Sequence, residues 1–208
     1  MVCLSNAIAA NCDNPLDAAI KNSCIVNESL WRGAKPNPVA AASLVEHGVK
    51  TIVNLELLHD DLGAFGAFDK SDVKVNNPVT QSIQYFRIRD WEPIVAVSHR
   101  TVDKHVAEFI AITRSAPSPI YVHCRSGRNR TGVMVAAYKV FNGTPIEEAV
   151  ADMKRFNGEW FKHDAKYIRT LTPARLLALE KKITVAQSKL EKEADISCID
   201  AVCKILKK

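Results

Sequence analysis

Apolar and polar positions along the chain follow two alternating patterns, one typical of strands and one typical of helices. Residues 49–56 (VKTIVNLE) and 118–124 (SPIYVHC) are short, β-branched apolar runs of the kind found in buried strands. Residues 83–90 (IQYFRIRD) alternate apolar and polar side chains, as a half-buried strand does. Residues 29–36 (SLWRGAKP) form a shorter segment that ends in turn residues. The pattern predicts four strands.

Helical periodicity occupies the intervals between and after these strands. Residues 98–116 begin with Ser98 as a cap and repeat Val102, Val106 and Phe109 on one face. Further helices are predicted from Pro38 to Gly48, from Thr131 to Gly143, from a Thr144 cap to Gly158, and from Pro173 onward. Strands that alternate with helices indicate an α/β fold with a central, mostly parallel sheet flanked by helices.

The pattern describes one continuous domain with flanking segments. A chain of 208 residues suits one domain. We assign residues 29–172 to this domain, residues 1–28 to an N-terminal segment, and residues 173–208 to a C-terminal helical extension that packs on the domain or is appended to it. Residues 57–80 have no clear periodicity and are expected to form a surface excursion.

Composition narrows the classes of function. Hydrophobic residues at 47% and charged residues at 25% are ordinary for a globular protein. The net charge of +5 would tolerate an anionic substrate but does not by itself argue for nucleic acid. The chain has no run of about 18 apolar residues, so no transmembrane helix is predicted. We expect a monomer without a nucleic-acid partner.

The N-terminal segment and the cysteines leave two cellular locations open. The segment MVCLSNAIAANC lacks the basic start of a secretory signal, although residues 7–9 have the small-x-small form of a cleavage site. Besides Cys3 and Cys124, an even number of cysteines is left: Cys12, Cys24, Cys198 and Cys203. We favour free thiols in a cytoplasmic protein over disulfides in an exported one. The chain has no Cys-x-x-Cys and its histidines are dispersed, so neither a metal site nor another cofactor is expected.

The most informative stretch is YVHCRSGRNRTGVMVAAY, residues 121–138, where three arginines and one cysteine lie between a predicted strand and a predicted helix. Cys124 ends the strand and Thr131 begins the helix, so the intervening residues form a turn. The N–H groups of such a turn converge on one point, to which the helix N-terminus adds partial positive charge. Gly127 lets the backbone approach a bound group, and Arg130 can hold two phosphate oxygens with its planar guanidinium. The turn predicts an oxyanion site whose natural occupant is a phosphate.

The same positive field acts on Cys124. A thiol at a helix N-terminus beside guanidinium groups loses its proton readily, so Cys124 is expected to be a thiolate at neutral pH. A thiolate held beneath a phosphate is a nucleophile. The alternative is a small buried Cys124 with arginines in surface salt bridges. It does not explain why His-Cys, five residues and Arg-Thr occur together at a strand-to-helix turn.

The stretch HCRSGRNRTG resembles the signature loop of the cysteine-dependent protein tyrosine phosphatase superfamily, and residues 29–158 resemble its compact dual-specificity branch. The resemblance implies a dual-specificity phosphatase-like fold and hydrolysis of phosphate monoesters through a cysteinyl-phosphate. It implies that Cys124 is the nucleophile and that Arg130 binds phosphate and stabilises the transition state. It also implies that Thr131 assists release of the cysteine and that His123 holds the loop. The residues expected to bind substrate are Arg125, Ser126, Gly127, Arg128, Asn129 and Arg130.

The leaving oxygen needs a proton, which a carboxyl group upstream of Cys124 would supply. Asp90 is our prediction, because it ends a predicted strand and lies 34 residues before Cys124, a spacing typical of compact family members. Glu92 is the nearest alternative. Asp60 and Asp61 lie in a less constrained region of the sequence.

Two substrate classes are compatible with the loop. Arg125 and Arg128 exceed what the mechanism needs, and loops with basic residues at both places resemble those of phosphoinositide and inositol-phosphate phosphatases. No long loop for deep phosphotyrosine recognition is evident, which suggests a shallow pocket. We favour a dual-specificity protein phosphatase, with a phosphoinositide or inositol-polyphosphate phosphatase as the alternative. A non-catalytic phosphate-binding module is a remote third possibility.

Overall fold

The computed structural model of the chain describes residues 16–66, 80–156, 158–199 and 202–207. Seven strands of these residues form one sheet in the order β1-β2-β5-β3-β4-β6-β7. The strands are β1 (Cys24–Asn27), β2 (Leu30–Ala34), β3 (Thr51–Glu56), β4 (Thr80–Asp90), β5 (Ile120–Cys124), β6 (Ala194–Ile199) and β7 (Val202–Lys207). The four central strands are parallel, as predicted, whereas β1, β6 and β7 pair antiparallel at the two edges.

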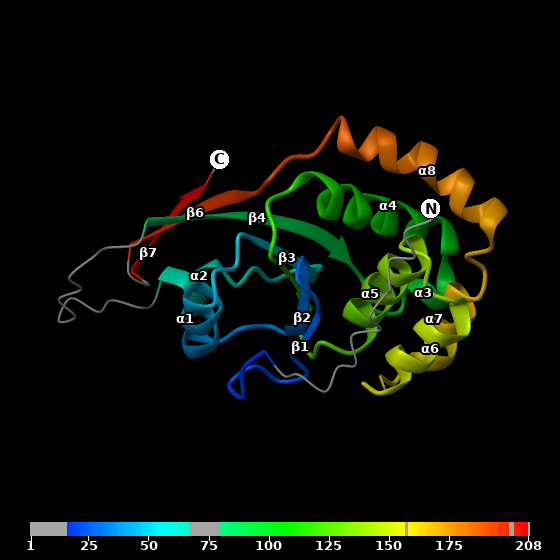
Figure 1. Cartoon of the computed structure of the whole chain (residues 1–208), viewed down its shortest axis with the longest axis horizontal. Coiled ribbons are helices and arrows are strands. Elements are labelled where there is room, and N and C mark those ends of the chain that lie inside the picture. Colours follow the sequence, from blue (N-terminus) through cyan, green and yellow to red (C-terminus); the bar gives the residue numbers. More distant parts are fainter. Residues whose placement is uncertain (1–15, 67–79, 157, 200–201, 208) are drawn as a thin grey trace, which may run out of the picture.

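Helices cover both faces of the sheet (Figure 1). They are α1 (Pro38–Glu46), α2 (Leu62–Gly66), α3 (Ile94–Val97), α4 (His99–Ser115), α5 (Asn129–Phe141), α6 (Ile146–Lys154), α7 (Phe161–Ile168) and α8 (Pro173–Gln187). Adjacent residues of one strand face opposite sides. Ile52 therefore packs in the hydrophobic cluster beneath α1 and α2, whereas Val53 packs in the cluster beneath α4 to α8. The result is the predicted α/β fold with helices on either side of the sheet.

Most predicted helix starts carry the expected caps. The Asn37 side chain accepts a hydrogen bond from the Ala40 N–H at 2.8 Å, and the Ser98 hydroxyl accepts one from the Thr101 N–H at 3.3 Å. The predicted Thr144 cap is wrong, because α6 begins after Pro145 without a side-chain cap. That helix also ends at Lys154, before Gly158.

Helix α5 begins at Asn129, two residues before the predicted start at Thr131. The backbone of Arg128 already has helical dihedral angles, so the last residues of the turn belong to the first turn of the helix. The N-terminus of α5 therefore lies inside the stretch HCRSGRNRTG rather than after it.

Two regions differ from expectation. In residues 57–66, Asp61, Leu62 and Phe65 are buried, so this part is not a surface excursion; residues 67–79 lie outside the described residues. The C-terminal extension is not wholly helical: α8 packs on α4, and β6 and β7 then extend the sheet beside β4. A disulfide joins Cys198 to Cys203 across these two strands, so the free thiols that we favoured are wrong for this pair. No helix in the described residues is long and apolar enough to cross a membrane.

Strand β1 belongs to the segment that we separated from the domain, and it pairs with β2 at one edge of the sheet. The structural unit therefore includes at least part of residues 1–28. The strand that leads into the loop motif is nevertheless an interior one, because β5 lies between β2 and β3.

Candidate active site

The cysteine loop leaves the sheet at the carboxyl end of β5. Cys124, which is fully buried, pairs in register with Ala34 on β2, and the preceding His123 pairs with Asn54 on β3. Ligands of open parallel sheets bind outside this end of the strands. A pocket of about 600 Å³ lies there. Its charged lining consists of Lys35, Glu56, Asp90, Glu92, Arg125 and Arg130.

The back of the loop is held by two donors from the N-terminal part of the chain. The Asn22 side chain donates to the Ser126 carbonyl at 2.7 Å, and the Arg32 guanidinium donates to the Gly127 carbonyl. Carbonyls bound from behind allow the loop to direct its N–H groups to the opposite side, where a phosphate would lie. This arrangement suits the predicted oxyanion site.

Gly127 is required for a different reason from the one expected. It has a positive φ of 72°, and a side chain there would collide with the backbone of Gly33 and Ala34. Glycine therefore permits the loop to pack against β2, rather than only allowing a bound group to approach.

Arg32 is a site residue that the sequence pattern did not reveal. Its guanidinium is buried and lies 3.5 Å from the ring centroid of Phe156. Burial lowers the pKa of Arg32 to about 10, an effect that the charge of Cys124 opposes. Arg32 is therefore a cation at neutral pH, positioned behind the loop. The available signal was an arginine within an apolar strand segment (LWRGA), which demands a buried partner.

Arg130 is fixed along one edge of its guanidinium. Nη1 donates to the carbonyls of Leu55 and Asp90, both at 3.1 Å, and Nη2 lies 3.4 Å from Glu92 Oε2. The Nε group is buried and has no hydrogen-bond partner among the described residues. It is thus available to an oxyanion. Thr131 also has a buried hydroxyl that no described residue bonds.

Both candidate acids reach the pocket. Asp90 ends β4 as predicted, is nearly buried, and places Oδ1 3.2 Å from His105 Nδ1 on α4. Glu92 follows in the next loop and is paired with Arg130. Trp91, between them, is half exposed and also lines the pocket. The structure thus brings Asp90 and Glu92 together near Arg130.

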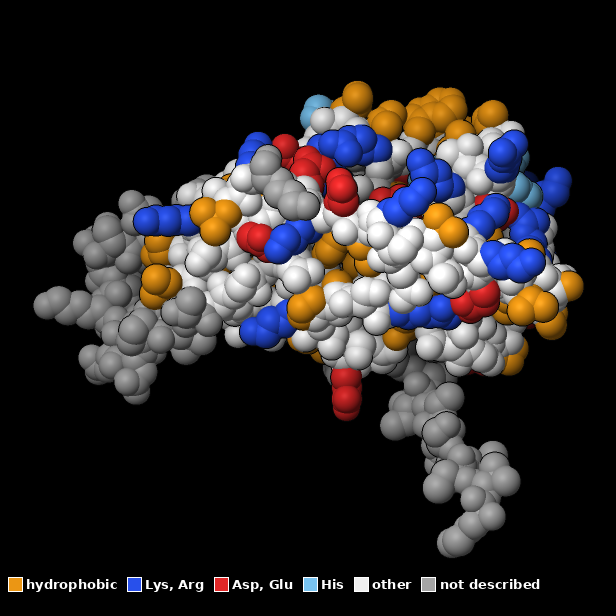
Figure 2. All heavy atoms as spheres, turned by 90° about the horizontal axis from the view of Figure 1, so that it is seen from above, with side chains coloured by type: hydrophobic (Ala, Val, Ile, Leu, Met, Phe, Trp, Pro, Cys, Tyr) orange, Lys and Arg blue, Asp and Glu red, His pale blue; other side chains and the backbone are white. Residues whose placement is uncertain are grey.

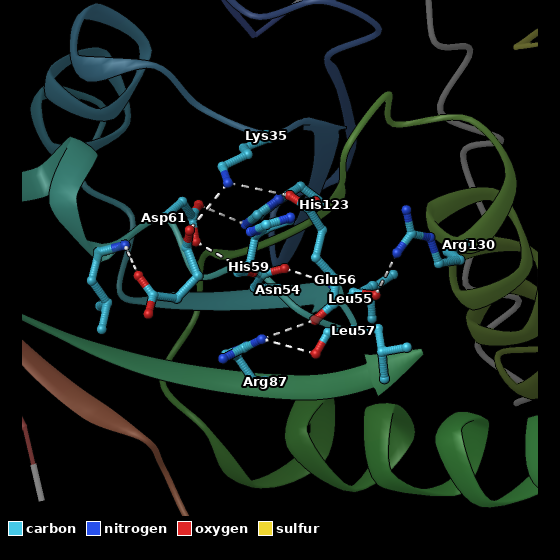
Figure 3. A network of polar contacts seen from close by, with 12 residues as sticks. Lys35, Asn54, Leu55, Glu56, Leu57, His59, Asp61, Arg87, His123 and Arg130 are labelled. Carbon is cyan, nitrogen blue, oxygen red and sulfur yellow. Dashed lines mark hydrogen bonds and ion pairs between the residues drawn. The ribbon is translucent and has the colours of Figure 1, made fainter. Parts of the chain in front are cut away.

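His123 belongs to a buried network beneath the loop (Figure 3). Its Nε2 lies 3.0 Å from Asp61 Oδ2, and Asp61 also accepts hydrogen bonds from Asn54 at 2.9 Å and from the Tyr85 hydroxyl. Burial alone would raise the pKa of Asp61, but His123 and Tyr85 hold that pKa below its usual value. Asp61 is therefore not in an unconstrained region. Asp61 pairs with His123, whose Nδ1 has no hydrogen-bond partner among the described residues, so the role of His123 in holding the loop stays a prediction.

The other predicted site residues lie in different surroundings: some are exposed, and Asn129 is buried. Arg125 is exposed and lines the pocket, whereas Arg128 is exposed and is not part of the lining. Ser126 is bound from behind through its carbonyl. Asn129 is buried and donates from its side chain to Asp164 on α7 at 3.0 Å. The exposed Asp60 contributes a backbone carbonyl to Lys35 at 3.1 Å.

A larger cavity, of about 780 Å³, lies between α4 and α8. Its lining is rich in lysine and shares no residue with the pocket over the loop, so the two are separate. Figure 2 looks down on the molecule from above Figure 1 and shows basic and acidic side chains interspersed over that face.

The fold and the loop define a cysteine-dependent phosphatase of the protein tyrosine phosphatase superfamily, of the dual-specificity type. More narrowly, the chain belongs to the family described as DSP-PTPase phosphatase fused to NAD+ kinase, which it matches over residues 17–169. It is 22% identical over 139 residues to OCA1 from Meyerozyma guilliermondii, whose name places it among tyrosine-protein phosphatases. That match covers 66% of this chain and 72% of OCA1.

Solved structures share the fold. TpbA from P. aeruginosa has a TM-score of 0.57 and 22% identity, with 83% of this chain and 93% of TpbA covered. The core catalytic domain of the PP-IP phosphatase SIW14 from S. cerevisiae has a TM-score of 0.58 and 15% identity, with 79% and 94% covered.

Proposed function

We propose that this phosphatase acts on phosphorylated tyrosine, serine and threonine side chains of proteins. The observation that carries the proposal is the lining of the pocket over the loop. Exposed apolar side chains border it, namely Leu57, Leu58 and Trp91, which suit the apolar side chains that flank a phosphorylated residue. Basic and acidic groups are balanced there, three of each besides His59. A highly charged polyphosphate favours a lining with an excess of basic groups.

The proposed reaction begins at Cys124. Its thiolate attacks the phosphorus, the S–P bond forms, and the bond from phosphorus to the ester oxygen breaks. The loop N–H groups and Arg130 Nε hold the phosphoryl oxygens, and Asp90 gives its proton to the departing oxygen. Water then attacks the cysteinyl-phosphate. Asp90 accepts a proton from that water, and the Thr131 hydroxyl stabilises the departing thiolate.

Replacement of the nucleophile tests the chemistry. Cys124→Ser should abolish hydrolysis of p-nitrophenyl phosphate, because a serine hydroxyl at this position has no base to ionise it. The variant should still bind vanadate, since loop backbone and Arg130 are unchanged. Thermal unfolding that matches the wild type would establish that the variant is folded. Turnover within threefold of wild type would contradict the cysteine mechanism.

The acid is tested by a matched pair of variants. Asp90→Ala should slow hydrolysis of an aryl phosphate with a poor leaving group by about 10²–10⁴-fold, and that of p-nitrophenyl phosphate much less. Glu92→Ala should instead slow hydrolysis of both substrates by a similar factor, because Arg130 loses its ion pair with Glu92. If the two variants exchange these behaviours, Glu92 is the acid.

A second substrate class has one structural observation in its favour. Arg125 and Lys35 both line the pocket and could receive a second phosphate of an inositol polyphosphate or phosphoinositide. A panel decides between the classes: we expect kcat/KM to be higher for phosphotyrosine and phosphothreonine peptides than for inositol polyphosphates. The reverse order, by tenfold or more, would establish the inositol alternative.

A further inference from the structure

His105 is a buried polar side chain on an otherwise apolar face of α4. It is only 9% exposed. It shares this face with Val102, three residues before it, and Phe109, four residues after it, and both belong to the hydrophobic cluster beneath α4 to α8. A polar group that is removed from water needs a partner within the protein. The partner of His105 must therefore come from an element that packs against α4.

The group that His105 meets is the carboxyl of Asp90, at the end of β4. His105 Nδ1 lies 3.2 Å from Asp90 Oδ1. Both atoms are buried, and neither has an aligned hydrogen bond to any described residue. They are thus within hydrogen-bond distance of each other, and a small rotation of either side chain would align them. Contacts of catalytic groups are often poorly aligned before substrate binds and tighten in the complex.

The backbone of Asp90 is held separately from its side chain. Arg130 Nη1 donates to the Asp90 carbonyl at 3.1 Å, so the cysteine loop fixes the main chain at this position but not the carboxyl group. Asp90 lines the pocket, while its Oδ1 is buried and turned toward α4. Oδ2 is therefore the carboxyl oxygen that is left to face the pocket.

We propose that His105 is a positioning residue for Asp90: its Nδ1–H donates to Oδ1 and thereby directs Oδ2, with the transferable proton, toward the leaving oxygen. The inference rests on the proposed role of Asp90 as the general acid. A protonated carboxyl group has one acceptor oxygen and one hydroxyl, so a donor at Oδ1 keeps the proton on Oδ2. After the proton has left, Oδ1 of the carboxylate still accepts from Nδ1–H. His105 thus holds Asp90 in one orientation through both steps of the reaction.

The test compares two replacements of His105 in the full chain. His105→Asn places a side-chain N–H close to the position of Nδ1, whereas His105→Leu fills the space without a donor. With an aryl phosphate that has a poor leaving group, His105→Leu should lower kcat/KM by about 10–100-fold, because a displaced acid transfers its proton poorly. With p-nitrophenyl phosphate, whose leaving group needs little protonation, the loss should stay within about threefold. His105→Asn should recover most of the activity toward the poor leaving group.

Controls separate positioning from a general effect on α4. Thr113→Val removes a polar group from the same helix, about two turns beyond His105, and should leave both activities unchanged. Thermal unfolding establishes that each variant is folded. If His105→Leu does not fold, His105→Gln takes its place, because its longer side chain does not put a donor at the position of Nδ1 and should show the same selective loss. Equal losses on the two substrates, or an Asn variant as impaired as the Leu variant, would overturn the proposal.

Asp90→Ala distinguishes failure of the inference from failure of the acid assignment. In the Asp90→Ala background, His105→Leu should cause no further loss, since the group that His105 positions is gone. If Asp90→Ala does not slow hydrolysis of the poor leaving group, Asp90 is not the acid, and both assignments are wrong. If Asp90→Ala slows it selectively and His105→Leu alone does not, the acid assignment stands and the inference fails. A full additional loss in the double variant would show that His105 acts independently of Asp90 and would also reject the inference.

Discussion

Arg32 combines a buried charge with a bond to the loop. The guanidinium is desolvated, as its lowered pKa shows, and the bonds of a buried charge often only offset that desolvation. Its replacement by an apolar side chain of similar length should therefore change the free energy of unfolding by less than about 2 kcal/mol. The effect on the conformation of the loop should be larger, because the Gly127 carbonyl loses its hydrogen-bond donor.

We thus expect Arg32→Met to lower kcat/KM for p-nitrophenyl phosphate by tenfold or more, while denaturant unfolding changes little. Arg32→Lys keeps the charge but not the planar fork, so it should recover only part of the activity. If Arg32→Met loses more than about 3 kcal/mol of stability but its folded molecules have the wild-type kcat/KM, Arg32 serves folding alone.

The residues with a local signature were predictable, and those with distant partners were not. Cys124, Arg130 and Thr131 stand in one motif, and the strand and helix around them are visible in the hydrophobic pattern. Arg32 contacts Gly127 across 95 residues of sequence, and Asn22 contacts Ser126 across 104. No periodicity specifies such pairs, because the folded sheet alone brings β2 beside β5.

Helices and strands with a local sequence signal were also predictable, and those that depend on distant partners were not. Helix α8 begins with a proline, and β5 is a short apolar run, so each carries its own signal. Strands β6 and β7 were mistaken for helix, since their apolar and polar alternation is brief and follows a long helix. Their strand conformation depends on the edge of β4, where Gln81 pairs with Cys198. That edge is available only after the sheet forms.

The β6–β7 pair is closed by Cys198 and Cys203, five residues apart. A cross-link over so short a loop should stabilise the fold by about 2 kcal/mol through the chain entropy of the unfolded state. We expect the double variant Cys198→Ser, Cys203→Ser to lose this amount in denaturant unfolding with unchanged kcat, since both residues lie far along the sheet from Cys124. Alkylation of both thiols in the unreduced, denatured protein would contradict the disulfide.

The stability of the folded chain should depend on pH through Asp164. Its pKa is raised to about 7 in the folded state and is near 4 in the unfolded state, so the folded state binds the extra proton between these values. The free energy of unfolding contributed by this group is therefore complete below about pH 4 and is lost as pH rises through about 7. The shift of about three pKa units corresponds to at most about 4 kcal/mol.

Asp164→Asn cannot titrate, so its stability relative to the wild type should increase from pH 4.5 to pH 8 by up to about 4 kcal/mol. Urea unfolding at several pH values measures this difference, and other titrating groups cancel in the comparison. A difference that is constant with pH would mean that Asp164 is ionised throughout the range.

The balance of charge around the pocket makes a last prediction about substrate choice. Arg125 and Arg128 are a matched pair, because both are exposed, both lie on the loop and each carries one positive charge, but Arg125 lines the pocket and Arg128 does not. If Arg125 contacts a second phosphate, Arg125→Ala should reduce kcat/KM for a doubly phosphorylated peptide or an inositol polyphosphate by about 10–100-fold, the loss of one charged hydrogen bond. Arg128→Ala removes the same charge from the long-range field, so its smaller effect should vanish in high salt. For a singly phosphorylated peptide, neither substitution should change kcat/KM by much. Equal losses in the two variants would mean that the arginines act only through the field of the loop, and the inositol alternative would then rest on Lys35 alone.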